Sequence, residues 1–411
     1  MNRPLKIRVA LLSIVLLQLI IIVVALAHFG ISYVNIDSLQ DHPVQFCLLF
    51  IIPFWLGLVT LILALLPRLQ QIQFLLFIGL WLTAELVFGL INIGTPELIG
   101  EGEPQSLNQT DYYTEDPVLG YKVVPNNTAR HVESYGTQKL YDVIYRIDGL
   151  GRRVTPIDSP GLRTKLLLFF GDSNAFGDGV TQEQTLAYWA GKFAPDYRPY
   201  NYALSGYGPA QMLDLIKTRP LDKEVSERQG FAFYYFIQDH IARVIGSSQV
   251  STDWGIHFSR YVLNSGGQLV REGDFATGRP FLTLFYACVE ASNIVKYFRL
   301  RLPIRYSEAD YQLAAEIIAE SRRRLDKEFE LKNFYVIIAP VFNEQELAIS
   351  ERFMVHLKKV GVPFLDFTHL YDANEPQYTV AEEDAHNSGL ADRLIAAEIV
   401  RELGIGDATI H

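Results

Sequence analysis

Hydrophobic patterning divides the chain into an apolar front part and a longer part of mixed pattern. Residues 9–34, 46–66 and 72–93 each contain a run close to the about 20 apolar residues that a helix needs to cross a bilayer core. The first run is longer than the apolar part of a signal peptide, and no small-residue cleavage site precedes the second run. The pattern predicts a membrane region at 1–94 with three transmembrane helices.

Charges in the short flanks predict how this region is oriented. Arg3, Lys6 and Arg8 precede the first run, and Arg68 lies between the second and the third, whereas residues 35–45 contain no Lys or Arg. Because short basic flanks stay in the cytoplasm, the rest of the chain is predicted to lie on the opposite side. We therefore expect a multi-pass protein of the plasma (inner) membrane with its large domain extracytoplasmic, periplasmic or extracellular.

Two polar features of the predicted spans bear on their role. Glu85 lies within the third run, where an ionisable group is expensive and marks either a functional site or a contact between helices. We favour the contact, and an anchor over a transporter, because no second charge is available there to form a relay. Cys47 falls inside the second run and Cys288 is alone in the large domain, so no disulfide within that domain is expected.

Behind the membrane region, residues 95–157 are predicted to form a linker and a short β lead-in. The first part, 95–120, is rich in Gly, Pro, Glu, Asn and Asp without an apolar period. The second part alternates Val, Tyr and Ile with polar residues, as in KLYDVIYRID, which indicates short antiparallel strands. This segment suggests no chemistry of its own.

Residues 158–411 alternate between strand-length apolar runs and amphipathic helical spacing. The strands are expected at 165–170, 200–203, 231–237, 334–339 and 363–367. The helices are expected near 184–194, 210–219, 308–330, 344–360 and 390–403. This alternation predicts an α/β domain with a central parallel sheet covered by helices.

A long insert at 245–305 interrupts this alternation. It contains Trp254 and His257 and a mostly apolar, helix-like stretch at 281–298. Its length is typical either of a cap over a binding site or of a decoration packed on one face of the sheet, and the sequence leaves both open.

Charge and composition exclude some partners. The formal net charge of −10 has the wrong sign for a protein that must neutralise nucleic-acid phosphates, so no nucleic acid is expected. No cluster of His, Cys and carboxylates has the spacing of metal ligands, and no phosphate-binding glycine pattern is present. Neither a metal nor another cofactor is therefore predicted.

Candidate chemistry lies at two distant positions. The segment LLLFFGDSNAFGDG places Ser173 directly after a buried-type strand, where Gly171 allows a sharp turn, although Asp172 and Ser173 could also be simple helix caps. Far downstream, EEDAHNSGLADRLIAAEIV places Asp384 and His386 just before a helix. A serine hydroxyl needs a neutral imidazole to take its proton and a carboxylate to orient that imidazole, so these three residues form a candidate catalytic triad.

Four segments in order resemble the signature blocks of SGNH/GDSL hydrolases: GDSNAFGDG, NYALSGYG, FIQD and DAHNSGLADRLIA, across about 165–403. The resemblance implies a flavodoxin-like SGNH three-layer sandwich. It implies that Ser173 attacks an acyl carbon, that His386 is general base and then general acid, and that Asp384 orients the imidazole. The implied reaction is acyl transfer to water or to another hydroxyl, without a cofactor.

The same resemblance implies an oxyanion hole built from the amides of Ser173 and Gly206 and from a side chain of the third block. The family has Asn in that block, whereas this chain has Gln238. Gln can donate, but its extra methylene displaces the amide, and loss of one oxyanion donor costs roughly 10²–10³ in rate. A functional Gln238 and a weakened enzyme therefore both stay open.

The triad acid and the rim of the crevice leave further alternatives. The commonest family spacing puts the acid three residues before the His, at Glu383, but we favour Asp384, two residues before it. Polar neighbours at the same strand ends are candidates for the rim of the site. These are Asp172, Asn174, Asp239, His240 and Arg243. For His240 and Arg243, helix capping or pairing with Asp239 is an equal alternative.

Three functions are compatible with these residues. The first is an SGNH/GDSL-type serine hydrolase, either an O-acyl esterase or an acyltransferase, that acts on acylated cell-envelope glycans. In the transferase case, a membrane partner would supply the acyl donor. The second is a catalytically weak SGNH-like protein that binds a glycan or scaffolds the envelope, and the third is a lipase. An α/β-hydrolase is disfavoured because its nucleophile elbow requires Gly where this chain has Ala175.

Overall fold

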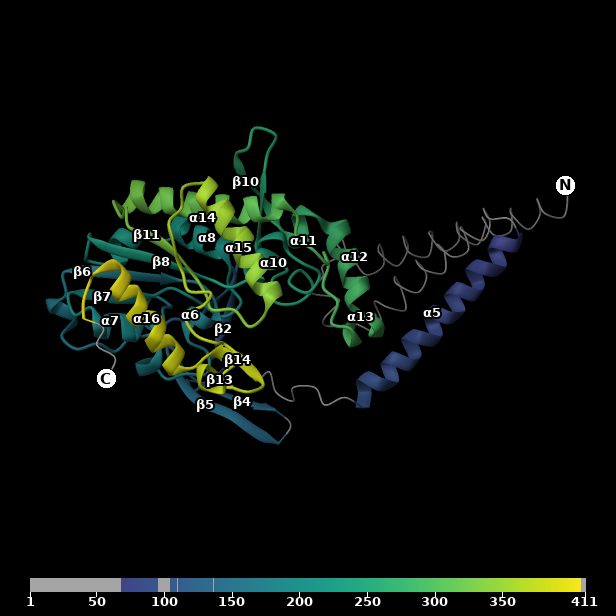
Figure 1. Cartoon of the computed structure of the whole chain (residues 1–411), viewed down its shortest axis with the longest axis horizontal. Coiled ribbons are helices and arrows are strands. Elements are labelled where there is room, and N and C mark those ends of the chain that lie inside the picture. Colours follow the sequence, from purple (N-terminus) through teal and green to yellow (C-terminus); the bar gives the residue numbers. More distant parts are fainter. Residues whose placement is uncertain (1–67, 95–103, 109, 136, 408–411) are drawn as a thin grey trace. The chain divides into compact units, whose positions relative to one another are not determined.

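The computed structural model describes residues 68–94, 104–108, 110–135 and 137–407 (Figure 1). The chain divides into two compact units, Met1–Thr95 with Cys288–Leu300, and Pro96–Ala287 with Arg301–His411. The predicted spans at 9–34 and 46–66 lie outside the described residues. The predicted span at 72–93 falls within helix α5 (Arg68–Gly94). Within the described part of the chain, no helix meets the length and hydrophobicity needed to cross a membrane.

In the first unit, α5 contacts the short helix α13 (Asn293–Tyr297). The carboxylate of Glu85 accepts hydrogen bonds from the Ser292 hydroxyl and from the Asn293 backbone N–H, the latter at 2.7 Å. Glu85 therefore makes a contact between two helical segments, which is the role favoured from the sequence.

The centre of the second unit is a five-stranded parallel sheet. Its strands, in spatial order, are β12 (Phe364–Asp366), β11 (Phe334–Ile338), β8 (Gly230–Phe236), β6 (Lys165–Phe170) and β7 (Tyr197–Asn201). When the five strands are numbered along the chain and the sheet is read from β7 to β12, the order is 2-1-3-4-5, the flavodoxin-like arrangement. The five predicted strands are confirmed, although the second begins three residues earlier than expected, because Tyr197 pairs in register with Lys165.

Helices cover both faces of this sheet. The longer ones are α7 (Leu186–Phe193), α8 (Pro209–Thr218), α10 (Asp239–Ile245), α14 (Glu308–Phe329), α15 (Glu344–Lys359) and α16 (Gly389–Leu403), all but α10 at predicted positions. Short helical turns are α6 (Ser173–Phe176), α9 (Leu221–Glu224), η2 (Pro160–Leu162), η3 (Gln182–Gln184) and η4 (Pro376–Tyr378). Helix α7 packs on α16, and α8 packs on α14. Figure 1 shows these two pairs on opposite sides of the strands, so the unit is a three-layer α/β sandwich.

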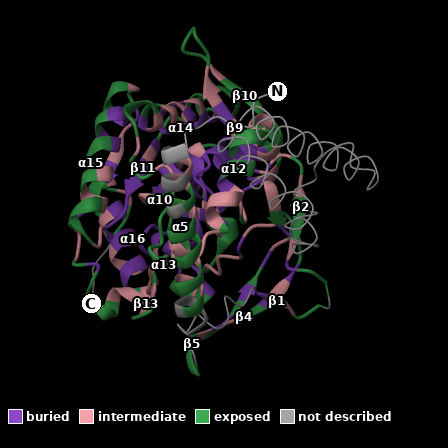
Figure 2. Ribbon diagram, turned by 90° about the vertical axis from the view of Figure 1, so that its right-hand side faces the viewer, coloured by how far each residue is buried: buried purple, intermediate pink, exposed green. Residues whose placement is uncertain are grey.

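Burial follows these layers. Strand β8, with the sequence GFAFYYF, is almost entirely buried because both faces of the sheet are covered. By contrast, α15 buries one side and exposes the other (Figure 2).

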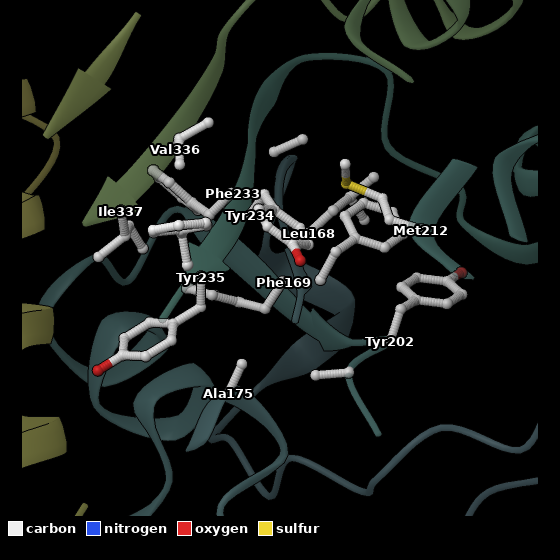
Figure 3. Packing of buried hydrophobic residues seen from close by; sticks show 14 of the residues in the cluster. Leu168, Phe169, Ala175, Tyr202, Met212, Phe233, Tyr234, Tyr235, Val336 and Ile337 are labelled. Carbon is white, nitrogen blue, oxygen red and sulfur yellow. The ribbon is translucent and has the colours of Figure 1, made fainter. Parts of the chain in front are cut away.

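In the core, the rings of Phe169 and Phe233 stack with centroids 5.2 Å apart. Figure 3 shows the ring of Tyr235 turned away from that pair, with its hydroxyl outermost. That hydroxyl accepts a hydrogen bond from the Asn387 side chain at 3.0 Å, which ties the core to the segment containing His386.

Smaller antiparallel sheets surround the sandwich. The lead-in forms a sheet of β1 (Gln105–Ser106), β4 (Thr128–Tyr135) and β5 (Gln138–Arg146) and a pair of β2 (Tyr113–Asp116) with β3 (Gly120–Val123). Near the C-terminus, β13 (Thr379–Ala381) pairs with β14 (Asp384–Asn387). The predicted short antiparallel strands are confirmed in β3, β4 and β5. The expectation of a linker without strands at 95–120 is wrong, because β1 and β2 lie there and pair with β4 and β3.

The insert at 245–305 contains a β-hairpin followed by helices. The elements are β9 (Ser259–Leu263), β10 (Leu269–Asp274), α11 (Phe275–Gly278), α12 (Pro280–Glu290) and α13. The apolar stretch at 281–298, expected as one helix-like segment, is divided between α12 and α13. The division falls at Ser292, whose hydroxyl caps α13 by accepting from the Val295 N–H at 3.3 Å.

Candidate active site

The turn after β6 holds Ser173 at the start of α6, where it is 7% exposed. Gly171 precedes it with a φ of +153°, and a Cβ on Gly171 would lie 2.8 Å from the Cβ of Ala175, so a larger residue does not fit. The Asp172 carboxylate caps the helix by accepting from the Asn174 N–H at 3.1 Å. Asp172 is therefore the helix cap, and Ser173 is the first residue of α6.

A buried arginine from the lead-in fixes the far end of this turn. Arg153, 2% exposed, donates to the carbonyls of Phe176 at 3.0 Å, Val180 at 2.5 Å and Gly177. Its cation thus lies at the C-terminal end of α6, where carbonyl groups are left without helical partners. The lead-in, which suggested no chemistry of its own, thus supplies a side chain that holds the Ser173 turn.

The segment β14 brings an imidazole and a carboxylate to the same turn. His386 Nδ1 lies 2.6 Å from Asp384 Oδ1, and that oxygen also accepts from the His386 N–H at 3.0 Å. The Asn387 N–H donates to the Asn174 side chain at 3.0 Å. Asn387 follows His386 and Asn174 follows Ser173, so this hydrogen bond shows that the two candidate catalytic residues lie on adjoining segments.

This pairing bears on which acid serves His386. Asp384 contacts the imidazole, whereas Glu383 is exposed, so the geometry favours Asp384. Burial opposes a charged imidazole, but the hydrogen bond and charge of Asp384, with the charges of Asp178 and Asp172, outweigh it and raise the pKa of His386 to about 9. Burial likewise opposes the charged carboxylate, yet the hydrogen bond to His386 lowers the pKa of Asp384 below its usual value.

The loop after β7 lies beside the Ser173 turn. The Leu204 N–H donates to the Gly171 carbonyl at 3.3 Å, and the Ser205 hydroxyl donates to Asp178 at 2.6 Å. Gly206 follows with a φ of +79°, a left-handed conformation that favours glycine. The structure thus brings Gly206, the second candidate oxyanion donor, to the loop that faces the nucleophile.

Gln238, the third candidate donor, has a different partner. Its side-chain nitrogen donates to the Ser350 hydroxyl of α15 at 2.8 Å. Because this hydrogen bond turns the amide toward α15, Gln238 is not positioned by a contact with the Ser173 turn.

The remaining rim candidates are placed differently from one another. His240 has no exposed surface and lies behind the nucleophile turn, with its Nδ1 2.8 Å from the Tyr234 hydroxyl and its Nε2 3.4 Å from Asp172. Arg243 is also buried, 3.7 Å from the same carboxylate. Neither lines an open rim, because both side chains lie on the buried side of α10. Asp239 is exposed and lies 3.4 Å from Arg301.

Replacing Asp172 by Asn should lower the free energy of unfolding by about 3–5 kcal/mol, because it leaves the buried cation of Arg243 without its anion. Urea denaturation measures this loss. Asp239→Asn removes an exposed carboxylate directly before His240 in the chain and should change the midpoint little. Equal midpoints for the two variants would contradict a stabilising role for the buried cluster.

Within the described residues, no group of three or more His, Cys, Asp and Glu side chains is arranged to hold a metal ion.

No family model and no curated protein matches the sequence. Several solved structures are similar. A member of the lipolytic protein G-D-S-L family from Veillonella parvula shares 12% identity over 58% of this chain and 97% of its own, with a TM-score of 0.35. An acetyl xylan esterase from the rumen bacterium Butyrivibrio proteoclasticus shares 12% identity over 64% and 68%, with a TM-score of 0.32. A carbohydrate esterase whose active site displays divergent catalytic and non-catalytic binding functions shares 12% over 74% and 88%, with a TM-score of 0.36. At these TM-scores the similarities carry no conclusion about activity.

Proposed function

We propose that this protein is a serine hydrolase of the SGNH/GDSL type that acts on ester bonds. The observation that carries the proposal is the 2.6 Å contact between His386 and Asp384 on a segment hydrogen-bonded to the residue after Ser173. With Nδ1 paired to the carboxylate, the other imidazole nitrogen is left to accept the hydroxyl proton.

The reaction then proceeds in two steps. Ser173 Oγ attacks the acyl carbon while its proton passes to His386, and the same proton is given to the alkoxide that leaves. Water, or a hydroxyl of an acceptor, next attacks the acyl-enzyme and gives its proton to His386, which passes that proton to Ser173 Oγ as the acyl product leaves. Asp384 stabilises the imidazolium that forms in both steps.

A serine-reactive fluorophosphonate tests the proposal on the full-length protein in detergent. We expect labelling, and hydrolysis of short-chain p-nitrophenyl esters, in the wild type and in Ser265→Ala, since Ser265 is exposed in the β9–β10 turn. Both should be lost in Ser173→Ala. A folded wild type without labelling, or equal labelling of the two variants, would refute a serine hydrolase at Ser173.

For the substrate, we propose an acylated glycan of the cell envelope, either deacylated or used as acceptor for an acyl group from a membrane-embedded donor protein. Support comes from the predicted apolar runs at 9–34 and 46–66, which would tether the chain to a membrane, from the basic flank before the first run, and from Arg68 after the second. Acetate release from O-acetylated polysaccharides, compared with p-nitrophenyl esters of increasing chain length, separates a glycan esterase from a lipase. Preference for long acyl chains would favour the lipase.

The predicted placement of the site outside the cytoplasm has its own test. Fusions of alkaline phosphatase and of a green fluorescent protein after residue 110 should give an active phosphatase and a dark fluorescent protein. The reverse pattern would place the site in the cytoplasm.

The pH dependence of kcat/KM follows from the electrostatics of His386. The base must be neutral, so activity should rise with pH through a midpoint near the pKa of about 9. In Asp384→Gln the charge that stabilises the imidazolium is gone, and the midpoint should move to lower pH although the maximal rate falls. The measurement is a pH profile of p-nitrophenyl acetate hydrolysis for both proteins, and a midpoint that rises in the variant would contradict this assignment.

A second candidate function is a catalytically weak domain that binds a glycan. The observation that favours it is the hydrogen bond from Gln238 to Ser350, which engages the third candidate oxyanion donor with α15. Loss of one such donor costs roughly 10²–10³ in rate. Glycan binding by Ser173→Ala, together with a wild type that binds but does not turn over any ester, would favour this alternative.

A further inference from the structure

Two consecutive peptide units, Ser205–Gly206 and Gly206–Tyr207, are held from outside the loop, the first from the lead-in and the second from the insert. The Tyr121 hydroxyl of β3 donates to the Ser205 carbonyl at 2.5 Å. The Trp254 indole N–H of the insert donates to the Gly206 carbonyl at 3.4 Å. Both donors come from segments outside the α/β sandwich proper, and both act on the loop that follows β7.

We propose that Tyr121 is a positioning residue, which sets the direction of the Gly206 N–H as an oxyanion donor. In a planar trans peptide the N–H points opposite to the carbonyl of the same peptide unit. The carbonyl of this unit belongs to Ser205 and faces the Tyr121 hydroxyl, so the Gly206 N–H is turned to the other side. The inference rests on the proposed serine hydrolase function.

Two hydrogen bonds to the Ser173 turn fix the position of the Gly206 N–H relative to the nucleophile. The Ser205 hydroxyl donates to Asp178, which follows α6 on the Ser173 turn, at 2.6 Å. One step earlier, the Leu204 N–H donates to Gly171 on the same turn. The peptide is therefore fixed between the nucleophile turn, through the Ser205 side chain, and the lead-in, through the Ser205 carbonyl.

Tyr121 is itself held in place. Its backbone carbonyl accepts from the Tyr207 hydroxyl at 2.5 Å, and its ring lies against those of Tyr113 and Phe258, with centroids 5.4 and 5.7 Å away. A Cβ at Gly206 would collide with the Tyr121 hydroxyl and lie 2.9 Å from the Trp254 ring. Glycine is thus required at this position both for its φ and for the approach of these two side chains.

Preorganisation of this kind matters in the transition state. An oxyanion donor helps only when it already points at the place where negative charge develops, because reorienting it would cost free energy during the reaction. Removing the Tyr121 hydroxyl frees the peptide to rotate, which should weaken binding of the tetrahedral intermediate more than binding of the planar ester.

The test compares Tyr121→Phe with Tyr135→Phe, since Tyr135 is an exposed tyrosine of the same lead-in. For Tyr121→Phe we expect kcat for p-nitrophenyl acetate to fall about 10- to 100-fold, less than the full loss of a donor, with KM nearly unchanged. The inhibition constant of an alkyl boronic acid, which forms a tetrahedral adduct with the serine, should rise by a similar factor. Tyr135→Phe should match the wild type in both.

A second variant keeps the test informative if Tyr121→Phe folds poorly. Trp254→Phe keeps a ring and removes only the indole N–H, which holds the other peptide unit of Gly206 at its carbonyl. This change loosens Gly206 from its C-terminal side, so a smaller fall in kcat is expected, again without a change in KM. An active wild type in which Tyr121→Phe, or in its place Trp254→Phe, retains the kcat and boronate affinity of Tyr135→Phe would overturn the inference. A wild type without Ser173-dependent hydrolysis would instead refute the proposed function.

Discussion

Replacing His386 by alanine should lower kcat for ester hydrolysis on the order of 10⁶-fold, about as much as removing the nucleophile itself, because His386 is the base proposed for the serine hydroxyl. The structure supports this expectation through the adjoining positions of the two residues, bridged by the hydrogen bond between Asn387 and Asn174. Stopped-flow or steady-state hydrolysis of p-nitrophenyl acetate measures kcat and KM for the variant and the wild type.

The matched control is His369→Ala, because His369 is an exposed histidine of the same domain. It should keep the wild-type kcat. A double variant, Ser173→Ala with His386→Ala, should be no slower than either single variant, since the two residues act as a unit. Additive losses, or a His386→Ala protein with more than a tenth of the wild-type rate, would contradict the assignment of His386 as base.

Asp384→Asn is expected to lower kcat about 10⁴-fold with little change in KM. The carboxylate accepts from His386 Nδ1, and an amide in its place presents an N–H to that nitrogen, which favours the wrong tautomer and no longer stabilises the imidazolium. The same hydrolysis assay measures the loss. This variant keeps the size of the side chain, so circular dichroism and the melting temperature should show an intact fold.

Glu383→Gln is the control that separates the two acids considered from the sequence. Glu383 is adjacent in the chain but exposed, so the change should leave kcat within about twofold of the wild type, as surface substitutions usually do. A large loss in Glu383→Gln together with an active Asp384→Asn would assign the acid to Glu383 instead.

Much of the fold could be predicted from local patterns. The strands at 165–170 and 334–339 are continuous apolar runs, as expected when helices cover both faces of a sheet, and each is found within a residue of its predicted end. The second strand starts earlier than predicted because Tyr197 and Pro199 extend the pairing of β7 with β6 toward the N-terminus. Pairing with a neighbouring strand is not a local property of the sequence. The same limit applies to the apolar stretch at 281–298, where a single serine cap divides one predicted helix into two.

The candidate site was predictable where a residue type carries its own chemistry. Ser173, Asp384 and His386 are recognisable because their order and their place at strand ends match a known mechanism. Arg153 and Tyr121 were missed, since a buried arginine or tyrosine that binds backbone carbonyls looks the same in sequence as one on the surface. Their only signal was their place in a lead-in whose strands pack beside the sandwich, which becomes visible only in three dimensions.

His240 and Arg243 show the opposite error. Their position after a strand end suggested a rim, but the first turn of α10 directs both into the interior, where they face the carboxylate of Asp172. In this chain, two polar residues that follow a strand end belong to the buried support of the Ser173 turn and not to an open rim. Only the direction of the helix that follows distinguishes the two.

The most direct test of the central claim is to trap the acyl-enzyme and locate it. The full-length protein is mixed with a slowly deacylating p-nitrophenyl ester, quenched in acid and digested, and the peptides are analysed by mass spectrometry. We expect one added acyl group, on Ser173, and none in Ser173→Ala. An acyl group on another residue, or turnover of the ester without any adduct on Ser173, would contradict it.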